Sequence, residues 1–309
     1  MAAPSVRAQA ISTRDAVAQR LRGGATDWRG VALEAVLLLS ILVALGVLVV
    51  LIADVVLRAV PVLLDRPIDF LTNPVSARAQ RAGIVQALIG SISVTLVVVI
   101  LAIPLGIGAA IYLEEYARDT RFSRFVRTNV RNLAGVPAIV YGLLGLAIFV
   151  TALQLGKVAL AGGLTLAVLV LPIVVITASE ALQAVPGSIR EAALGVGATR
   201  WETIRSHVLP YAAPGILTGT ILSLARAFGE TAPLLMVGAI AGTFSFVGGP
   251  VEQLGQSYTT LPTLIYHWAG YPQADFRALT GATIVVLLVV ILLVNAAAIT
   301  LRNRYDRTW

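Results

Sequence analysis

Long apolar segments alternate with shorter polar ones along the whole chain. Each apolar segment reaches the roughly 20 residues that an α-helix needs to cross a bilayer. The first is far longer than the roughly 7–15 apolar residues of a secretory signal, so we expect an uncleaved anchor there. The pattern predicts an all-α membrane protein with six transmembrane helices, at 31–57, 84–112, 133–153, 160–180, 212–240 and 279–301.

Composition supports this assignment. The chain is 58% hydrophobic and only 13% charged, with a mean hydropathy of +0.87, whereas about a quarter of the residues in soluble domains are charged. Its net charge of +7 comes from arginines that gather in the two tails and in the loops on the same side as the tails. The positive-inside rule places that side, with both termini, in the cytoplasm. The topology therefore explains the excess positive charge, and no nucleic-acid partner is expected.

Catalytic chemistry has few candidate residues. There is no cysteine, and the only two histidines, His207 and His267, fall on opposite sides of the predicted topology. Thiolate chemistry and disulfides are excluded, and a histidine metal site is not expected. No phosphate-binding loop, zinc-protease or serine-hydrolase motif occurs. We therefore expect no catalytic site, no metal and no cofactor bound by this chain.

The polar segments define the remaining organisation. We expect a cytoplasmic tail at 1–30, an external loop at 58–83, a long external connection at 241–278 that can hold a short helix, and a second cytoplasmic tail at 302–309.

The loop after the second span is amphipathic. Arginines recur there at every third position, with Phe122, Phe125 and Val126 between them: Arg118, Arg121, Arg124 and Arg127. Such a segment is typical of a helix lying in the interface of a membrane, so lipid is an expected partner.

Residues 185–210, "VPGSIREAALGVGATRWETIRSHVLP", predict a cytoplasmic helix–turn–helix. Capping boxes fit at Ser188 with Glu191 and at Thr199 with Glu202. Gly197 stands where a helix end favours a left-handed residue, and Pro210 is expected to reset the chain before the next span. The small residues of the first helix suit close approach by another protein. The spacing alone also fits a hairpin that rests on its own bundle or on lipid.

This stretch resembles the EAA loop of permease subunits from binding-protein-dependent ABC importers. The matching residues are Glu191, Ala192, Ala193, Gly197, Leu209 and Pro210, while His207 stands where the family has an aliphatic residue. The resemblance implies that these residues couple the permease to a cytoplasmic ATPase.

A charged turn interrupts the fifth apolar segment. Arg226 lies 14 residues after Ala212, or about 21 Å along a helix, near the middle of a hydrocarbon core about 30 Å thick. Glu230 follows at i+4, close enough to pair with it. One reading is a structural staple between helices. The other is a substrate path or gate, because guanidinium suits phosphate oxygens and Thr231 adds a hydroxyl donor.

The turn "RAFGETAPLL" is similar to a hallmark of the permeases of phosphate-specific ABC importers. "IPLGIGAAIYLEEY" and "NLAGVPAIVYGLLGLAIFV" are similar to the same family, over about Gly83 to Leu301, and "APLL" with "LPTLIY" resembles its PstA type. The resemblance implies a MetI-like type I transmembrane domain with its permease core at 84–301. It implies half of a heterodimeric pore with a PstC-type permease, two copies of a PstB-type ATPase that use ATP and Mg, and an external PstS-type phosphate-binding protein. Arg226, Glu230 and Thr231 are then the expected phosphate path.

Our interpretation is a permease that moves inorganic phosphate inward. The alternatives are a permease for another oxyanion or phosphonate, an ion-coupled secondary transporter in which Arg226 and Glu230 relay charge, and a signalling scaffold without a path of its own.

Overall fold

The structure is a computed structural model that describes residues 28–240 and 251–305. The chain divides into two units, Met1–Asp54 and Val55–Trp309. Most of the predicted tail 1–30 and the last four residues of the predicted tail 302–309 lie outside the described residues, as do residues 241–250 of the predicted external connection.

The first helix, α2, covers Trp28–Asp65. Its residues 28–54 are exposed, including their leucine and valine side chains. A helix that is apolar all round is expected to be buried in lipid or in other helices. This segment therefore has the character of a membrane span, as predicted for 31–57.

Helix α2 continues beyond the predicted span into the region expected to be a loop. It runs through Pro61 because Ala59 and Val62 are buried in an apolar cluster that also holds Phe276 and Leu279. Two short helices follow in the rest of 58–83: α3, Pro67–Thr72, and a 3-10 turn, Ala79–Arg81.

Helices α4, Val85–Ile111, and α7, Ala159–Gln183, form the centre of the second unit. Glycines bring them together: a Cβ added at Gly106 would lie 2.7 Å from Val174, and one added at Gly163 would lie 2.6 Å from Val97. Small residues at such positions let membrane helices approach closely.

The predicted span at 133–153 is not one straight helix. Helix α5, Arg121–Ala134, ends before Gly135, and α6, Ala138–Gly145, continues through a wide π turn at Leu146–Ala152. The two parts meet at 101°. Within the described residues, five helices are long and apolar enough to cross a membrane, or six if this bent pair forms one span.

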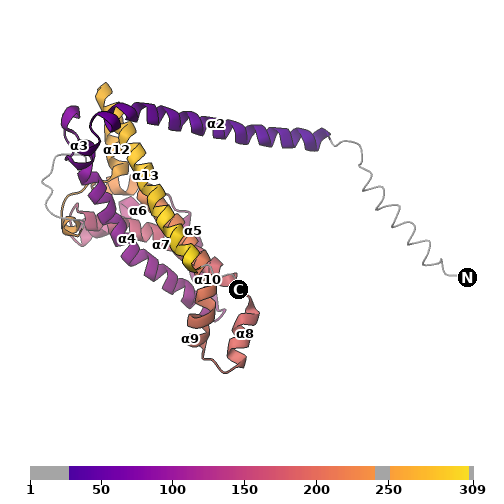
Figure 1. The fold of residues 1–309 in the computed structure, drawn as a ribbon. Helices are drawn as coiled ribbons and strands as arrows, with labels where there is room; N and C mark the ends of the chain where they lie inside the picture. The colour runs from indigo at the N-terminus through magenta and orange to yellow at the C-terminus, as the bar shows by residue number, and fades with distance from the viewer. Residues whose placement is uncertain (1–27, 241–250, 306–309) are drawn as a thin grey trace, which may run out of the picture. The chain divides into compact units, whose positions relative to one another are not determined.

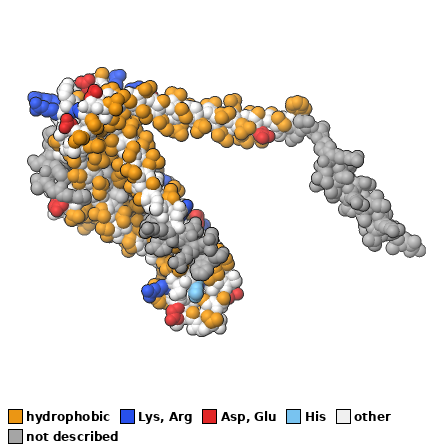
Figure 2. Space-filling model, viewed as in Figure 1, with side chains coloured by type: hydrophobic (Ala, Val, Ile, Leu, Met, Phe, Trp, Pro, Cys, Tyr) orange, Lys and Arg blue, Asp and Glu red, His pale blue; other side chains and the backbone are white. Residues whose placement is uncertain are grey.

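The remaining helices complete the bundle. Helix α10, Leu209–Gly229, packs against α7 and against the long last helix α13, Ala274–Tyr305 (Figure 1). Helix α12, Leu261–Ala269, lies in the predicted external connection and packs on α13. Figure 2 shows charged side chains gathered near α3 and near α8 and α9, with apolar side chains covering the helices between. This is the pattern of a bundle that spans a membrane.

Candidate coupling and translocation site

The predicted helix–turn–helix is present at one end of α10 (Figure 1). Its first helix is α8, Gly187–Gly195, and its second begins with α9, Arg200–Thr203. Gly197 between them has φ +88°, a conformation that favours glycine, as predicted. The capping box of Thr199 and Glu202 is confirmed. The box predicted at Ser188 is wrong, because α8 already begins after Pro186 and places Ser188 inside the helix.

Pro210 does not separate the hairpin from the span. Helix α9 passes through a wide π turn, Ile204–Val208, directly into α10, so helix runs from Arg200 to Gly229. The wide turn already interrupts the regular ladder of backbone hydrogen bonds, so the missing N–H of Pro210 costs little there. The second helix of the hairpin and the fifth span therefore form one continuous helix.

The tip of the hairpin presents apolar side chains to solvent. Val196 is 87% exposed, and Leu194 and Trp201 are more than half exposed. Glu191 and Ala192 are exposed as well, whereas Ala193 is buried against the chain. The two small residues of α8 that were expected to suit close approach therefore differ, because Ala192 is exposed and Ala193 packs inside the hairpin. The exposed apolar tip has the character of a docking surface.

Three consecutive residues after α4 hold the hairpin, α5 and α7 together. Within the wide π turn Tyr112–Tyr116, Glu115 binds Arg190 of α8 with Nη2 at 2.7 Å and Nε at 3.2 Å. The Glu115 side chain is only 7% exposed. Tyr116 lies beneath the guanidinium of Arg200, 5.2 Å from its ring centre. The end of α4 thus fixes both helices of the hairpin.

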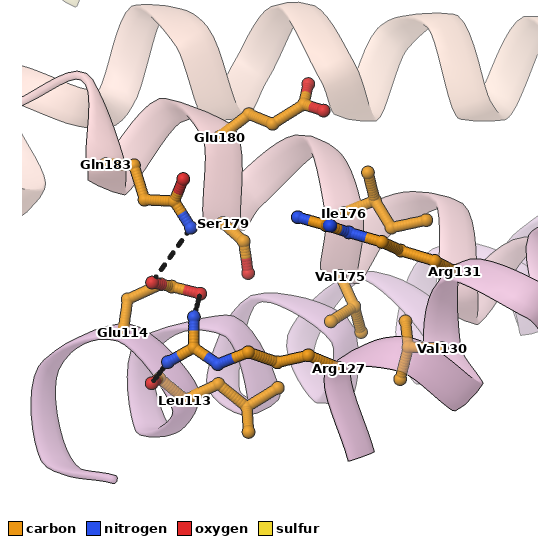
Figure 3. A pocket seen from close by; sticks show the side chains of 10 residues that line it. All are labelled: Leu113, Glu114, Arg127, Val130, Arg131, Val175, Ile176, Ser179, Glu180 and Gln183. Carbon is orange, nitrogen blue, oxygen red and sulfur yellow. Dashed lines mark hydrogen bonds and ion pairs between the residues drawn. The ribbon is translucent and has the colours of Figure 1, made fainter. Parts of the chain in front are cut away.

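Glu114 of the same turn ties α5 to α7 (Figure 3). Its carboxylate accepts hydrogen bonds from Arg127 Nη1 at 2.7 Å and from Gln183 Nε2 at 3.0 Å. The cleft beside them has a volume of about 30 Å³ and is also lined by Arg131 and Glu180. That space holds a water molecule or two, so these residues form a polar joint rather than a substrate chamber.

Neither the contacts of Glu114 nor those of Glu115 were predicted from the sequence. Glu115 and Arg190 are 75 residues apart, and periodicity within one helix cannot detect such a pair. The available signal was the pair of acids Glu114 and Glu115 at the end of an apolar span, on the side where arginines predominate.

Arg226 and Glu230 lie at a break in the fifth span, which was predicted to be continuous to residue 240. Helix α10 ends at Gly229, Glu230 is extended, and the short helix α11 covers Ala232–Val237. Glycine weakens the helix there, and Pro233 cannot donate a backbone hydrogen bond. Arg226 Nε lies 3.3 Å from Glu230 Oε1, so the predicted pair forms across the helix end.

Exposure distinguishes the two partners. The Arg226 side chain is 55% exposed and that of Glu230 only 18%. The guanidinium therefore extends away from the chain's own packing, while the carboxylate sits against it. Thr231 is half-buried in the same break. An arginine in the last turn of a helix is also favoured by the helix dipole.

A tight contact fixes the break. Helix α11 packs against α6, where a Cβ on Gly142 would lie 2.7 Å from Pro233 Cα. The charged turn and the hairpin occupy opposite ends of one helix, with 26 residues, or about 39 Å of helix, between Arg200 and Arg226. In the part of the chain that the structure describes, no group of three acidic, histidine or cysteine side chains is placed to hold a metal.

Comparisons with known proteins agree with this arrangement. The family of binding-protein-dependent transport system inner membrane components matches residues 102–307. The PstA phosphate transport system permease of Xylella fastidiosa is 35% identical over 78% of this chain and 83% of its own length. The PstA phosphate transport system permease of Haemophilus influenzae is 33% identical over 82% of this chain and 87% of its own length. The probable ABC transporter permease YqgI of Bacillus subtilis is 36% identical over 56% of this chain and 58% of its own length.

Solved structures share the fold. An inward-facing MetNI methionine ABC transporter superposes with a TM-score of 0.59 and 19% identity, over 72% of this chain and 96% of its own. A bacterial alginate ABC transporter superposes with a TM-score of 0.65 and 16% identity, over 91% of this chain and 96% of its own. The chain is thus a multi-pass membrane permease with an ABC-transporter fold, and it belongs to the family of binding-protein-dependent transport system inner membrane components, in the branch of the PstA permeases.

Proposed function

We propose that this chain is the permease subunit of an ATP-driven importer that moves inorganic phosphate across the bacterial plasma membrane into the cytoplasm. It forms half of a translocation path, and a PstC-type permease supplies the other half. Two copies of a PstB-type ATPase use ATP and Mg, and an external PstS-type protein delivers phosphate. Both termini lie in the cytoplasm, and this chain binds no cofactor and has no catalytic site of its own.

The single observation that carries the proposal is the ion pair at the helix break. A guanidinium is costly in a membrane unless it faces a polar path or a partner, and that of Arg226 is more than half exposed. Its geometry suits two oxygens of a phosphate at once. Relatives that match most of this chain are named phosphate transport system permeases, which favours phosphate among oxyanions.

The residues suggest an order of events. Before phosphate enters, Glu230 holds Arg226; the 3.3 Å contact between Arg226 Nε and Glu230 Oε1 supports this step. An entering phosphate competes for the guanidinium, and Thr231 offers a further hydroxyl donor. When the ATPases close, they push the exposed hairpin tip, where Glu191, Ala192 and Gly197 stand. Because the helix from Arg200 to Gly229 has no break, that motion reaches the charged turn and switches the accessible side.

Reconstitution tests the proposal. A tagged copy of this chain should copurify with an ATPase and a second permease. In proteoliposomes with the binding protein, the assembly should take up labelled phosphate only when ATP is present. Arsenate should compete as a close analogue, whereas phosphonate, sulfate and molybdate should not. Uptake by this chain alone under an ion gradient would instead establish a secondary transporter, and competition by sulfate or molybdate would establish a different oxyanion.

A further inference from the structure

An apolar groove lies between the end of α4, α5 and α7. It has a volume of about 500 Å³, within the roughly 300–1,000 Å³ of small-molecule sites. A spanning helix is about 10 Å across and about 30 Å long, so the groove is too small to take a partner's helix whole. Its apolar lining comes from all three helices: Ala109, Phe122, Val126, Val130, Leu171 and Val175.

The lining of the groove also includes the cationic side chain of Arg118 and the hydroxyl of Thr120, and Arg121 follows Thr120 in the sequence. Both arginines are exposed, and neither side chain forms a hydrogen bond or ion pair with any residue of 28–240 or 251–305. Arg124 differs, because it lies 3.4 Å from Asp119. Arg118, which has no partner among the described residues, therefore lines the apolar slot, and Arg121 lies three residues further along the chain.

The outer face of α5 places the groove at the edge of the membrane. Phe122 is 74% exposed and Phe125 is 63% exposed, on a helix whose other face is rich in arginine. Exposed aromatic side chains beside arginines are typical of helices that lie at the boundary of headgroups and acyl chains. The joint of Arg127 with Glu114 holds α5 in this position.

We propose that this groove binds one anionic phospholipid, with its phosphate group on Arg118 and Arg121 and one acyl chain in the apolar slot. The charge complementarity selects the occupant, because a headgroup with net negative charge compensates the two guanidinium groups and a zwitterionic headgroup does so only in part. The apolar lining of the slot suits the acyl chain. This inference concerns lipid and is independent of which substrate the importer carries.

Native mass spectrometry of the assembled importer tests the site. The complex is mixed with phosphatidylglycerol or with phosphatidylcholine of the same acyl chains. We expect one phosphatidylglycerol to be retained preferentially. An arginine near an anionic membrane surface strengthens binding about fivefold, so Arg118→Gln with Arg121→Gln should weaken retention roughly 25-fold. Ala109→Phe, which fills the slot without changing charge, should reduce it as well.

The matched control is Arg78→Gln with Arg81→Gln. It removes two exposed arginines of the same spacing from the segment before α4, and it should leave retention unchanged. Equal retention of the two lipids, an unaltered signal in the Arg118 and Arg121 variant or in Ala109→Phe, or a groove that takes no lipid because a partner subunit covers it would each overturn the proposal.

Discussion

The ion pair between Glu115 and Arg190 can be removed one partner at a time. Arg190 donates to the carboxylate through Nη2 at 2.7 Å and through Nε, and also to the carbonyl oxygens of Leu182 and Val185. Because the Glu115 side chain is only 7% exposed, Arg190→Met leaves a buried charge without a partner. Such a change costs about 3 kcal/mol, so the hairpin should open about a hundredfold more often.

Hydrogen exchange in the assembled importer measures this opening. Amides of 187–208 report the free energy of local opening in each variant. Glu115→Gln alone should cost about 2 kcal/mol. The Arg190 guanidinium then loses its anionic partner but keeps its hydrogen bonds to the carbonyl oxygens of Leu182 and Val185. The double variant removes both charges, and it should recover about 2 kcal/mol relative to the sum of the single effects.

The exposed pair of Arg124 and Asp119 is the matched control. Its side chains are 62% and 78% exposed, and such pairs contribute about 0–1 kcal/mol. Arg124→Met should therefore leave exchange in the hairpin unchanged. The reasoning is refuted if the effects of Glu115→Gln and Arg190→Met simply add, or if Arg190→Met leaves protection of 187–208 as it was.

Three further predictions concern other parts of the structure. Gly197→Ala forces a left-handed φ on alanine at a cost of about 1 kcal/mol; it should lower the thermal stability of the complex and transport-coupled ATP hydrolysis, whereas Gly195→Ala should change neither measurement. Gly142→Val meets the backbone of Pro233 and should abolish uptake while the hairpin stays protected from exchange, in contrast to Gly108→Val, which has open space around it. Burial lowers the pKa of His267, so its neutral form is favoured in the fold; the protection of α12 should fall as the pH drops below about 6.5, and His267→Gln should remove that dependence.

The spans were predictable because their apolar residues must meet lipid or one another whatever the tertiary arrangement. The first, second and fourth predicted spans correspond closely to α2, α4 and α7. The 101° bend was not predictable in the same way. Gly135 and Pro137 mark a turn in the sequence, but packing of α5 on α7 sets its angle.

In the candidate site too, the local features were predictable from the sequence and the contacts between distant segments were not. Gly197 and the pair of Thr199 with Glu202 act within a few residues of sequence, so their conformations followed from local chemistry. The break after Gly229 depends on packing between α11 and α6. The contact of Glu115 with Arg190 forms only once the bundle is assembled. The two residues are 75 positions apart, so no periodic pattern within one helix reveals the pair.

Uptake of labelled phosphate by an Arg226→Gln importer tests the central claim most directly. The assembly is purified with its partners, checked by size-exclusion chromatography, and compared with wild type in proteoliposomes. Loss of charge-assisted hydrogen bonds to phosphate should reduce uptake about 10- to 100-fold while the complex stays intact. Uptake at the wild-type rate, or a complex that falls apart and so marks Arg226 as a structural staple, would contradict a phosphate path through this side chain.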